Sequence, residues 1–253
     1  LLLPGFSNLC LATAIEPLLG RENAKFETLK FGWLGNMFQD THGCAAWHET
    51  SIKSLQDVID AKEPVVFGAT SKSSYGNMHA RVLQAMAGAN VKIVTGYRGI
   101  KGVGKALQSG EVPVACAMSV STMKSAFSSL VNEGKFRLIV QFGREKHPYF
   151  GDATHFYSLL KTDEEKKVAD FFFSQSAIAR PAATPPGIPA DRLAALRTAF
   201  QETLRDPALL ADAKRIGIDV SPETHEQVET AFRDLYATPA ARLAKVKEIM
   251  GRK

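Results

Sequence analysis

The sequence lacks long hydrophobic runs, a dense set of cysteines and any long segment with charge of one sign. No run approaches the roughly 18 consecutive apolar residues that a membrane-spanning helix needs. The 3 cysteines, Cys10, Cys44 and Cys116, are too few and too scattered for a disulfide framework or a zinc ribbon. We therefore expect them to be small buried apolar residues, and they leave the redox compartment of the protein open.

The charge distribution argues against a nucleic-acid partner. The 31 basic residues are interleaved with 26 acidic ones for a net charge of +5, and no basic stripe is evident. This balance modestly favours small anions through long-range attraction. Hydrophobic residues make up 45% and charged residues 23% of the 253 residues, a composition typical of one large or two small globular domains.

Short apolar runs alternate with amphipathic helical stretches, a pattern typical of a parallel α/β protein. The expected strands are 1–3, 31–34, 44–47, 64–67, 91–94, 112–117, 136–141 and 176–179. The expected helices are 54–61, 75–86, 102–109, 123–133, 163–173, 191–204, 207–216, 224–236 and 239–249.

The most informative local feature is a buried strand that runs into small and polar residues. Val65-Val66-Phe67 is followed by Gly68-Ala69-Thr70-Ser71-Lys72-Ser73-Ser74, and a helix is expected from Tyr75. At such a junction, backbone N–H groups and the positive end of the helix dipole point toward the carboxyl edge of the sheet. This arrangement suits a carboxylate or a phosphate. The alternative is a plain helix cap in solvent.

Two motifs look catalytic, but each lacks a required part. The stretch from Gly99 to Lys105 nearly matches a phosphate-binding loop, yet Ala106 stands where a magnesium-ligating hydroxyl is needed, so a helix start is the better interpretation. Ser121 and Lys124 have the spacing of a serine acyltransferase, but no companion motif accompanies them.

The histidines offer no convincing metal site. His42, Cys44 and His48 would share one side of a strand, but their spacing matches no standard zinc site and no acidic residue completes the set. We interpret them as packing or pocket-wall residues. His79 falls in the helix after the Ser74 loop, where we expect a capped or solvated side chain.

Tyr97 and Arg98 follow the expected strand 91–94, at a position where pockets form in α/β proteins. Arg98 would hold an anion through two hydrogen bonds, and Tyr97 would cover an apolar ligand body. Solvent exposure of Arg98 is the alternative.

Several stretches together resemble one family, the periplasmic substrate-binding receptors of tripartite tricarboxylate transporters, also called Bug proteins. The similarity runs from about residue 15 to the C-terminus, and the order and spacing of the motifs carry it. The matching stretches are Glu16–Gly20, Phe31–Gly35, Val65–Thr70, Val94–Gly99, Ala106–Val112, Gly134–Arg137 and Arg180–Arg192.

The resemblance implies an α/β fold like that of type II periplasmic binding proteins, with two α/β/α lobes, a cleft and two crossover strands. Residues 1–49 and 179–253 would form lobe I and residues 50–178 lobe II, with crossovers near 48–52 and 176–184. By position, Gly68, Ala69, Thr70 and Ser73 match the ligand clasp of the second lobe. Ser119 and Ser121 fall in another turn of that lobe, and Ser7 and Asn8 in a pocket turn of the first.

The implied function is an extracytoplasmic receptor, not an enzyme, that captures a small organic carboxylate for a membrane transporter. It would work as a monomer without metal or cofactor. In the family, about seventy residues precede this region, so the first βα unit is expected to be missing. The chain opens on Leu1-Leu2-Leu3 without Met, so we also expect an upstream export signal outside this sequence.

Two other functions stay open at this stage. The first is an α/β enzyme acting on a phosphorylated or acyl substrate through the Gly99–Lys105 or Ser121–Lys124 motifs. The second is a sensor or interaction protein that uses the same fold to present its ligand state to a partner.

Overall fold

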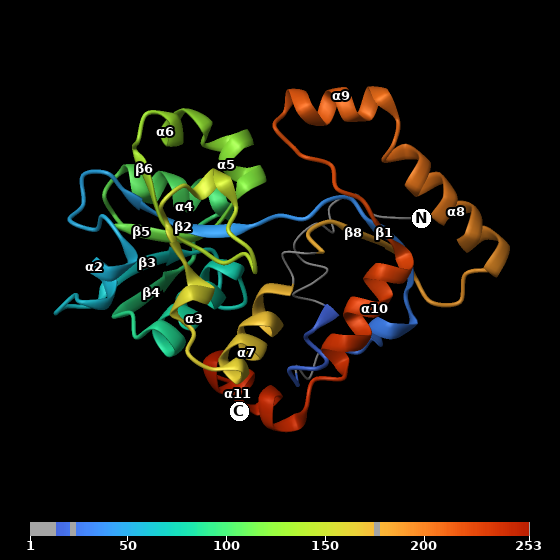
Figure 1. The fold of residues 1–253 in the computed structure, drawn as a ribbon, viewed down its shortest axis with the longest axis horizontal. Helices are drawn as coiled ribbons and strands as arrows, with labels where there is room; N and C mark the ends of the chain where they lie inside the picture. The colour runs from blue at the N-terminus through green and yellow to red at the C-terminus, as the bar shows by residue number, and fades with distance from the viewer. Residues whose placement is uncertain (1–13, 21–23, 175–177, 253) are drawn as a thin grey trace. The chain divides into compact units, whose positions relative to one another are not determined.

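The computed structural model describes residues 14–20, 24–174 and 178–252. Contacts divide the chain into two units (Figure 1). Unit 1 comprises the described parts of Leu1–Asp40 and Ser174–Lys245, and unit 2 comprises Thr41–Phe173 with the described part of Val246–Lys253. These units differ from the lobes expected from the sequence, because residues 41–49 and 246–253 belong to unit 2 but were expected in lobe I. The assignment of residues to lobes stays a prediction.

Unit 2 contains a six-stranded mixed sheet with the order β4-β3-β5-β2-β6-β7. The strands are β2 (His42–Trp47), β3 (Val65–Ala69), β4 (Val91–Thr95), β5 (Val114–Ser119), β6 (Phe136–Gln141) and β7 (Thr154–His155). Strands β4 and β5 are both parallel to β3, whereas β2 is antiparallel to β5 and to β6. The carboxyl ends of β3, β4, β5 and β6 therefore share one edge of the sheet with the first residue of β2.

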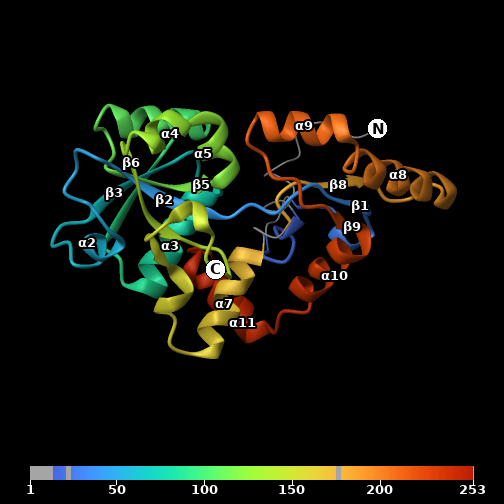
Figure 2. The same ribbon diagram turned by 45° about the horizontal axis from the view of Figure 1, so that its top comes forward.

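Helices cover both faces of this sheet (Figures 1 and 2). The face covered by α3 and α7 is separate from the face covered by α4, α5 and α6. The helices of unit 2 are α2 (Leu55–Ile59), α3 (Tyr75–Ala87), α4 (Gly99–Gln108), α5 (Val120–Ala126), α6 (Ser128–Asn132) and α7 (Asp163–Phe173), with the 3-10 turns η2 (Pro148–Phe150) and η3 (Phe156–Leu159).

Helix α3 has well-defined ends. The side chain of Ser74 accepts a hydrogen bond from the backbone N–H of Asn77 at its start, and Gly88 adopts a left-handed conformation with φ of 70° at its end. Both are common helix caps, because serine at the start accepts hydrogen bonds from free N–H groups and glycine at the end tolerates positive φ. These signals explain why the helix expected over 75–86 forms almost as predicted.

The two faces of the sheet have different cores. On the α4 side, Met118, Met123, Leu107 and Phe127 belong to one buried hydrophobic cluster with Trp47. On the α3 side the core is aromatic, and the centroids of the Phe142 and Phe173 rings lie 4.9 Å apart. Burial of side chains this large supplies most of the free energy that stabilises such a domain.

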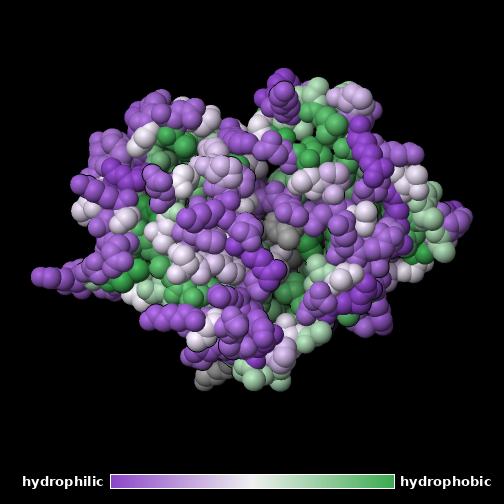
Figure 3. All heavy atoms as spheres, viewed as in Figure 1, coloured by the Kyte–Doolittle hydropathy of each residue, from purple (hydrophilic) through white to green (hydrophobic). Residues whose placement is uncertain are grey.

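Unit 1 is built on a three-stranded antiparallel sheet with the order β8-β1-β9. Its strands are β1 (Gly32–Asn36), β8 (Pro181–Thr184) and β9 (Glu223–Thr224), and its helices are η1 (Thr28–Lys30), α8 (Ala190–Thr203), α9 (Pro207–Arg215), α10 (His225–Tyr236) and most of α11 (Ala240–Ile249). Trp33 of β1 stacks on Phe232 of α10 with ring centroids 4.5 Å apart. No residue of α8 is buried, and hydrophobic surface lies over α9 (Figure 3), which carries Leu210 with 41% of its area exposed.

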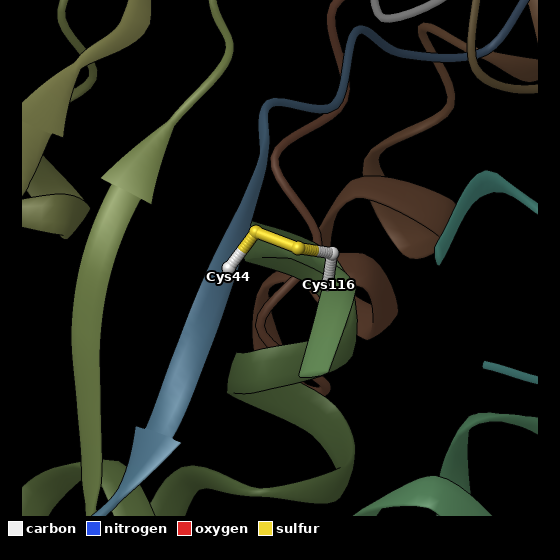
Figure 4. The surroundings of a disulfide bond; sticks show 2 residues. All are labelled: Cys44 and Cys116. Carbon is white, nitrogen blue, oxygen red and sulfur yellow. A yellow bond between two sulfur atoms is a disulfide. The ribbon is translucent and has the colours of Figure 1, made fainter. Parts of the chain in front are cut away.

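A disulfide joins Cys44 of β2 to Cys116 of β5 (Figure 4). The expectation that these cysteines are merely small buried residues is therefore incomplete: both are buried, but they are bonded to each other. A separation of 72 residues hides this pairing in the sequence, because only the antiparallel alignment of β2 with β5 brings the two residues together. Cys10 lies outside the described residues.

The observed elements differ from the expected ones in several places. The helix expected over 123–133 is two helices, α5 and α6, separated at Phe127. Helix α4 begins at Gly99 rather than at 102. Of the strand expected at 176–179, the described residues 178 and 179 form bends, and strand β8 begins at Pro181. Residues 48–51, near which a crossover strand was expected, form turns and bends within unit 2. The strand expected at 1–3 lies outside the described residues.

None of the helices in the described part of the chain has the length and apolar character needed to span a bilayer.

Candidate functional site

Strand register brings several polar segments to the carboxyl edge of the unit 2 sheet. Ala69 pairs with Thr95, and the backbone N–H of Gly96 donates to the carbonyl of Thr70 over 3.3 Å. On the other side of β3, Ser119 at the end of β5 pairs with His42 at the start of β2. The loop after β3, the turn after β5 and the start of β2 therefore lie at one edge, as the α/β pattern predicts for a ligand site.

The loop from Thr70 to Ser74 is held by its own hydrogen bonds. The hydroxyl of Ser74 donates to the carbonyl of Ser71 over 2.7 Å and accepts from the backbone N–H of Asn77 over 3.5 Å. The side-chain amide of Asn77 donates to the carbonyl of Lys72 over 2.7 Å. These contacts fix the loop against the first turn of α3, where the helix dipole favours a bound anion.

The four predicted clasp residues differ in exposure. Ala69 is buried, Thr70 is half-buried and Ser73 is exposed. A side chain at Gly68 would lie 3.0 Å from Val112 and 3.3 Å from Val103. A side chain at Gly68 would therefore crowd neighbouring side chains on the α4 side, whereas our sequence interpretation assigned this glycine to close approach of a ligand. Its contact with a ligand stays a prediction.

The turn after β5 contains a compact group of hydroxyls. Ser119 is only 3% exposed and caps α5, since its Oγ accepts from the backbone N–H of Thr122 over 3.2 Å. The same oxygen lies 3.2 Å from Oγ of Ser121 and 3.0 Å from Oγ1 of Thr122. The predicted residues Ser119 and Ser121 are therefore together, and Thr122 joins them.

A cluster of two imidazoles and a phenol lies beside this edge, and sequence reasoning missed it. The ring centroids of His42 and Tyr75 are 5.5 Å apart, those of His42 and His79 5.5 Å, and those of Tyr75 and His79 6.1 Å. The expectation of a capped or solvated His79 is wrong, because only 1% of its area is exposed. The four-residue spacing of Tyr75 and His79 places them on one face of α3, which was the available signal.

Burial controls the protonation of His79. Loss of solvent lowers the pKa of its imidazole well below the usual value, and the nearby His42 lowers it further. Nδ1 of this ring is buried and makes no hydrogen bond to any of the described residues. His79 is consequently a neutral ring at physiological pH.

Tyr97 does not join the loop hydroxyls. Its hydroxyl donates to Glu111 over 2.8 Å. Burial, the hydrogen bond to Glu111 and the charge of that carboxylate raise the pKa of Tyr97 to about 12. Its ring also packs on the hydrophobic cluster of the α4 side. Arg98 is exposed, as the alternative interpretation held.

The phosphate-loop and metal-binding alternatives find no support in the described residues, whereas Ser121 and Lys124 both lie in α5 and that catalytic alternative stays untested. The near-match to a phosphate loop is the first part of helix α4, so its glycines form no cradle. Cys44 is disulfide-bonded and is not a free ligand. Among residues 14–20, 24–174 and 178–252, no group of three or more histidine, cysteine, aspartate or glutamate side chains is placed to hold a metal. Ser7 and Asn8 lie outside the described part of the chain.

Comparison with solved structures defines the class of fold, that of two-lobe periplasmic binding proteins. The chain is similar to the periplasmic binding protein BugD, with a TM-score of 0.66 and 15% identity over 96% of this chain and 76% of that one. It is similar to MatC from Rhodopseudomonas palustris with bound malate, with a TM-score of 0.62 and 13% identity over 94% and 76%.

A third similar structure is R. palustris Rpa4515 with adipate, with a TM-score of 0.62 and 15% identity over 91% of this chain and 72% of that one. No protein-family model matches the chain, and no curated protein sequence matches it significantly. At these identities the likeness shows the fold, and the expected type II binding-protein architecture is confirmed.

Proposed function

We propose that this protein is an extracytoplasmic solute-binding receptor for a small organic carboxylate. It binds the carboxylate at the carboxyl edge of the unit 2 sheet and delivers it to a membrane transporter of the tripartite tricarboxylate type. The observation that carries the proposal is the location of the Thr70–Ser74 loop and the Ser119–Thr122 hydroxyls at that edge. Enclosure of the ligand by a second lobe stays a prediction.

The chemistry of this edge suits an anion held by neutral donors. Hydroxyls of Ser73, Ser119 and Ser121 and the first N–H groups of α3 are hydrogen-bond donors without a formal charge. Oriented donors of this kind stabilise a carboxylate, and water completes such sites in many proteins. The ligands named with two of the similar structures, malate and adipate, are small dicarboxylates, which supports the choice of ligand class.

A binding role fits this edge better than catalysis. A serine nucleophile needs a base within hydrogen-bond reach, and Oγ of Ser121 lies 3.2 Å from the Ser119 hydroxyl, which is not a base. The other catalytic motif is part of helix α4. We therefore propose a receptor without turnover.

The buried disulfide supports export to an oxidising compartment. Structural disulfides persist in the bacterial periplasm and are rare in the cytosol. Cys44 and Cys116 are 0% and 1% exposed, which is typical of a structural bond. A periplasmic location, action as a monomer and transfer to membrane subunits are parts of this proposal.

Thermal unfolding of the full chain with acetate, succinate, malate, adipate and citrate tests the function. Binding at 100 times Kd adds about 2.7 kcal/mol to the free energy of unfolding, so at least one acid should raise Tm by several degrees. Thr70→Val, which removes one hydroxyl at nearly constant volume, should weaken that response. Ser129→Ala, at an exposed residue of α6, is the control and should not.

Two results would contradict the proposal. One is an unchanged Tm with every acid of the panel. The other is consumption of the stabilising acid, followed by proton NMR of the mixture over hours, because a receptor returns its ligand unaltered.

A further inference from the structure

The outer side of helix α4 carries basic residues and no acidic one. Lys101 and Lys105 are exposed and four residues apart, which places them on one face of the helix. Arg98, the exposed N-cap residue, adjoins them, since its Cβ lies 3.8 Å from the position that a Cβ at Gly102 would take. We call Arg98, Lys101 and Lys105 the α4 face, and all of it is turned to solvent.

The charge of the α4 face is not compensated. None of its side chains forms an ion pair within the part of the chain that the structure describes. Helix α7 of the same unit is different, because Lys166 there pairs with Asp163 one turn away over 3.5 Å. The α4 face is therefore a local concentration of positive charge without an acidic neighbour.

This arrangement costs folding stability. Like charges four residues apart on a helix repel each other, and cations in the first turn lie at the positive end of the helix dipole. Helices α2 and α7 instead carry acidic residues in their first turns, Asp57 and Asp163–Glu165. A charge pattern that disfavours its own helix and makes no ion pair within the described residues indicates a partner outside them.

The α4 face adjoins the edge where the carboxylate is proposed to bind. Helix α4 follows β4, and in the turn between them the backbone N–H of Gly96 donates to the carbonyl of Thr70 over 3.3 Å. The N-terminal end of the face is therefore close to the Thr70–Ser74 loop. A receptor passes on its ligand where a partner reaches the binding edge, so a docking surface is expected next to that edge.

We propose that the α4 face is the docking surface for an acidic protein surface, rich in aspartate and glutamate, on the membrane subunit that receives the ligand. The inference rests on the proposed receptor function and names the surface through which it meets its partner. Opposite charges on two surfaces accelerate their encounter and fix their orientation, and exposed charges act mainly through the association rate.

Uptake by cells of the source organism tests this inference. Cells that lack the chromosomal gene receive the parent or a variant gene, and uptake of the radiolabelled acid that raises Tm most is followed. Lys101→Gln/Lys105→Gln should lower the initial uptake rate by about tenfold, the lower end of what electrostatic steering adds to association rates. The purified variant should bind the acid with unchanged Kd and have an unchanged or higher Tm, because both lysines are exposed and unpaired.

Two further variants separate the α4 face from net charge. Lys101→Arg/Lys105→Arg keeps both charges and should retain uptake. Lys161→Gln/Lys167→Gln removes the same charge from exposed residues of the α7 region and should also retain it. Normal uptake with Lys101→Gln/Lys105→Gln, an equal loss with the α7 pair, or a weakened Kd for the acid would overturn the inference.

Other occupants of the α4 face would also overturn it. Binding of the parent protein, but not of Lys101→Gln/Lys105→Gln, to phosphatidylglycerol vesicles would assign the face to a lipid surface. A dimer in sedimentation velocity that this variant loses would assign it to a second copy of the chain. Absence of uptake with the parent, although the acid binds, would overturn the inference and the transport role together, and absence of binding by every acid would overturn the receptor itself.

Discussion

Cys44 and Cys116 are direct partners in the antiparallel ladder between β2 and β5, and a disulfide joins them. Two residues earlier in β2, His42 is paired with Ser119 at the carboxyl edge. The same two strands that carry the bond therefore also carry part of the candidate site. The register of β2 shifts on either side of Cys44: between Gly43 and Cys44 in its pairing with β5, and between Cys44 and Ala45 in its pairing with β6.

Removal of this disulfide should destabilise the protein strongly. Closing a loop of 72 residues reduces the entropy of the unfolded chain, and a loop of this length corresponds to about 4 kcal/mol. Cys44→Ala/Cys116→Ala should lower the free energy of unfolding by about that amount, measured by urea denaturation. A reductant should destabilise the parent protein and leave the double variant unchanged; equal sensitivity of both proteins would contradict the bond.

The bulge beside the disulfide predicts an unusual effect of glycine. Ala117 has a φ of 64°, and the ladder passes from Cys116 to Met118 without pairing it. A left-handed conformation costs a non-glycine residue roughly 1–2 kcal/mol, and glycine avoids this cost. Glycine also gives the unfolded chain more conformational entropy, which lowers the free energy of unfolding by up to about 1 kcal/mol. Ala117→Gly should therefore leave stability unchanged or raise it by about 1 kcal/mol.

Ala115→Gly is the comparison for this prediction, because Ala115 lies in the same strand, is 0% exposed and pairs regularly with Ala45. Glycine at such a position should lower the free energy of unfolding by about 1 kcal/mol or more. Parallel urea titrations measure both. Equal destabilisation by the two substitutions would show that residue 117 is not left-handed.

Burial of a neutral His79 predicts a loss of stability in acid. Its pKa in the folded protein lies well below the usual value, chiefly because of burial. Below the unfolded pKa of about 6.5 the unfolded chain binds a proton that the folded chain does not. This difference lowers the free energy of unfolding by up to about 1.4 kcal/mol per pH unit as the pH falls from about 6.5 toward the folded pKa.

His79→Leu removes this titration and keeps a buried side chain of similar size. Urea titrations between pH 7 and pH 5 should give a shallower decline of stability for the variant than for the parent protein. His155→Leu is the comparison for His79→Leu, because the ring of His155 is only half-buried and has a hydrogen-bond partner, the carbonyl of Gly143. Identical pH slopes for the parent and His79→Leu would contradict a buried neutral imidazole.

Much of the fold could be predicted from local signals, but the pairing across strands could not. The helix after the Thr70–Ser74 loop was predictable because Ser74 and Gly88 are strong cap residues. The disulfide and the contact of His42 with His79 were not, because both depend on the order of strands in the sheet. Periodicity places a residue on one face of its own element and gives no information on its partner across the sheet.

The candidate site shows the same division. The joint location of Ser119 and Ser121 in a turn after a strand follows from the local α/β pattern, and the structure brings their hydroxyls together. Tyr97 carried an equally good local signal, and its contact with a ligand stays a prediction, but the bond of its hydroxyl to Glu111 was not predictable. That carboxylate is 14 residues away in sequence, so the partner of the Tyr97 hydroxyl depended on the packing of α4.

Two glycines of α4 predict opposite responses to alanine and test whether this segment is a helix rather than a phosphate loop. A Cβ at Gly102 would have ordinary contacts of 3.7 Å or more, whereas a Cβ at Gly104 would lie 2.6 Å from the ring of Phe127. Alanine is favoured over glycine within a helix by about 1 kcal/mol, so Gly102→Ala should raise the free energy of unfolding by up to that amount. Gly104→Ala should lower it by about 1–3 kcal/mol through overpacking.

The double variant Gly104→Ala/Phe127→Leu should be less destabilised than the sum of the two single variants, because the smaller side chain at residue 127 leaves room for the methyl group. Urea denaturation of the variants measures all of these effects, and destabilisation of similar size by both single alanine substitutions would contradict the helical packing of α4.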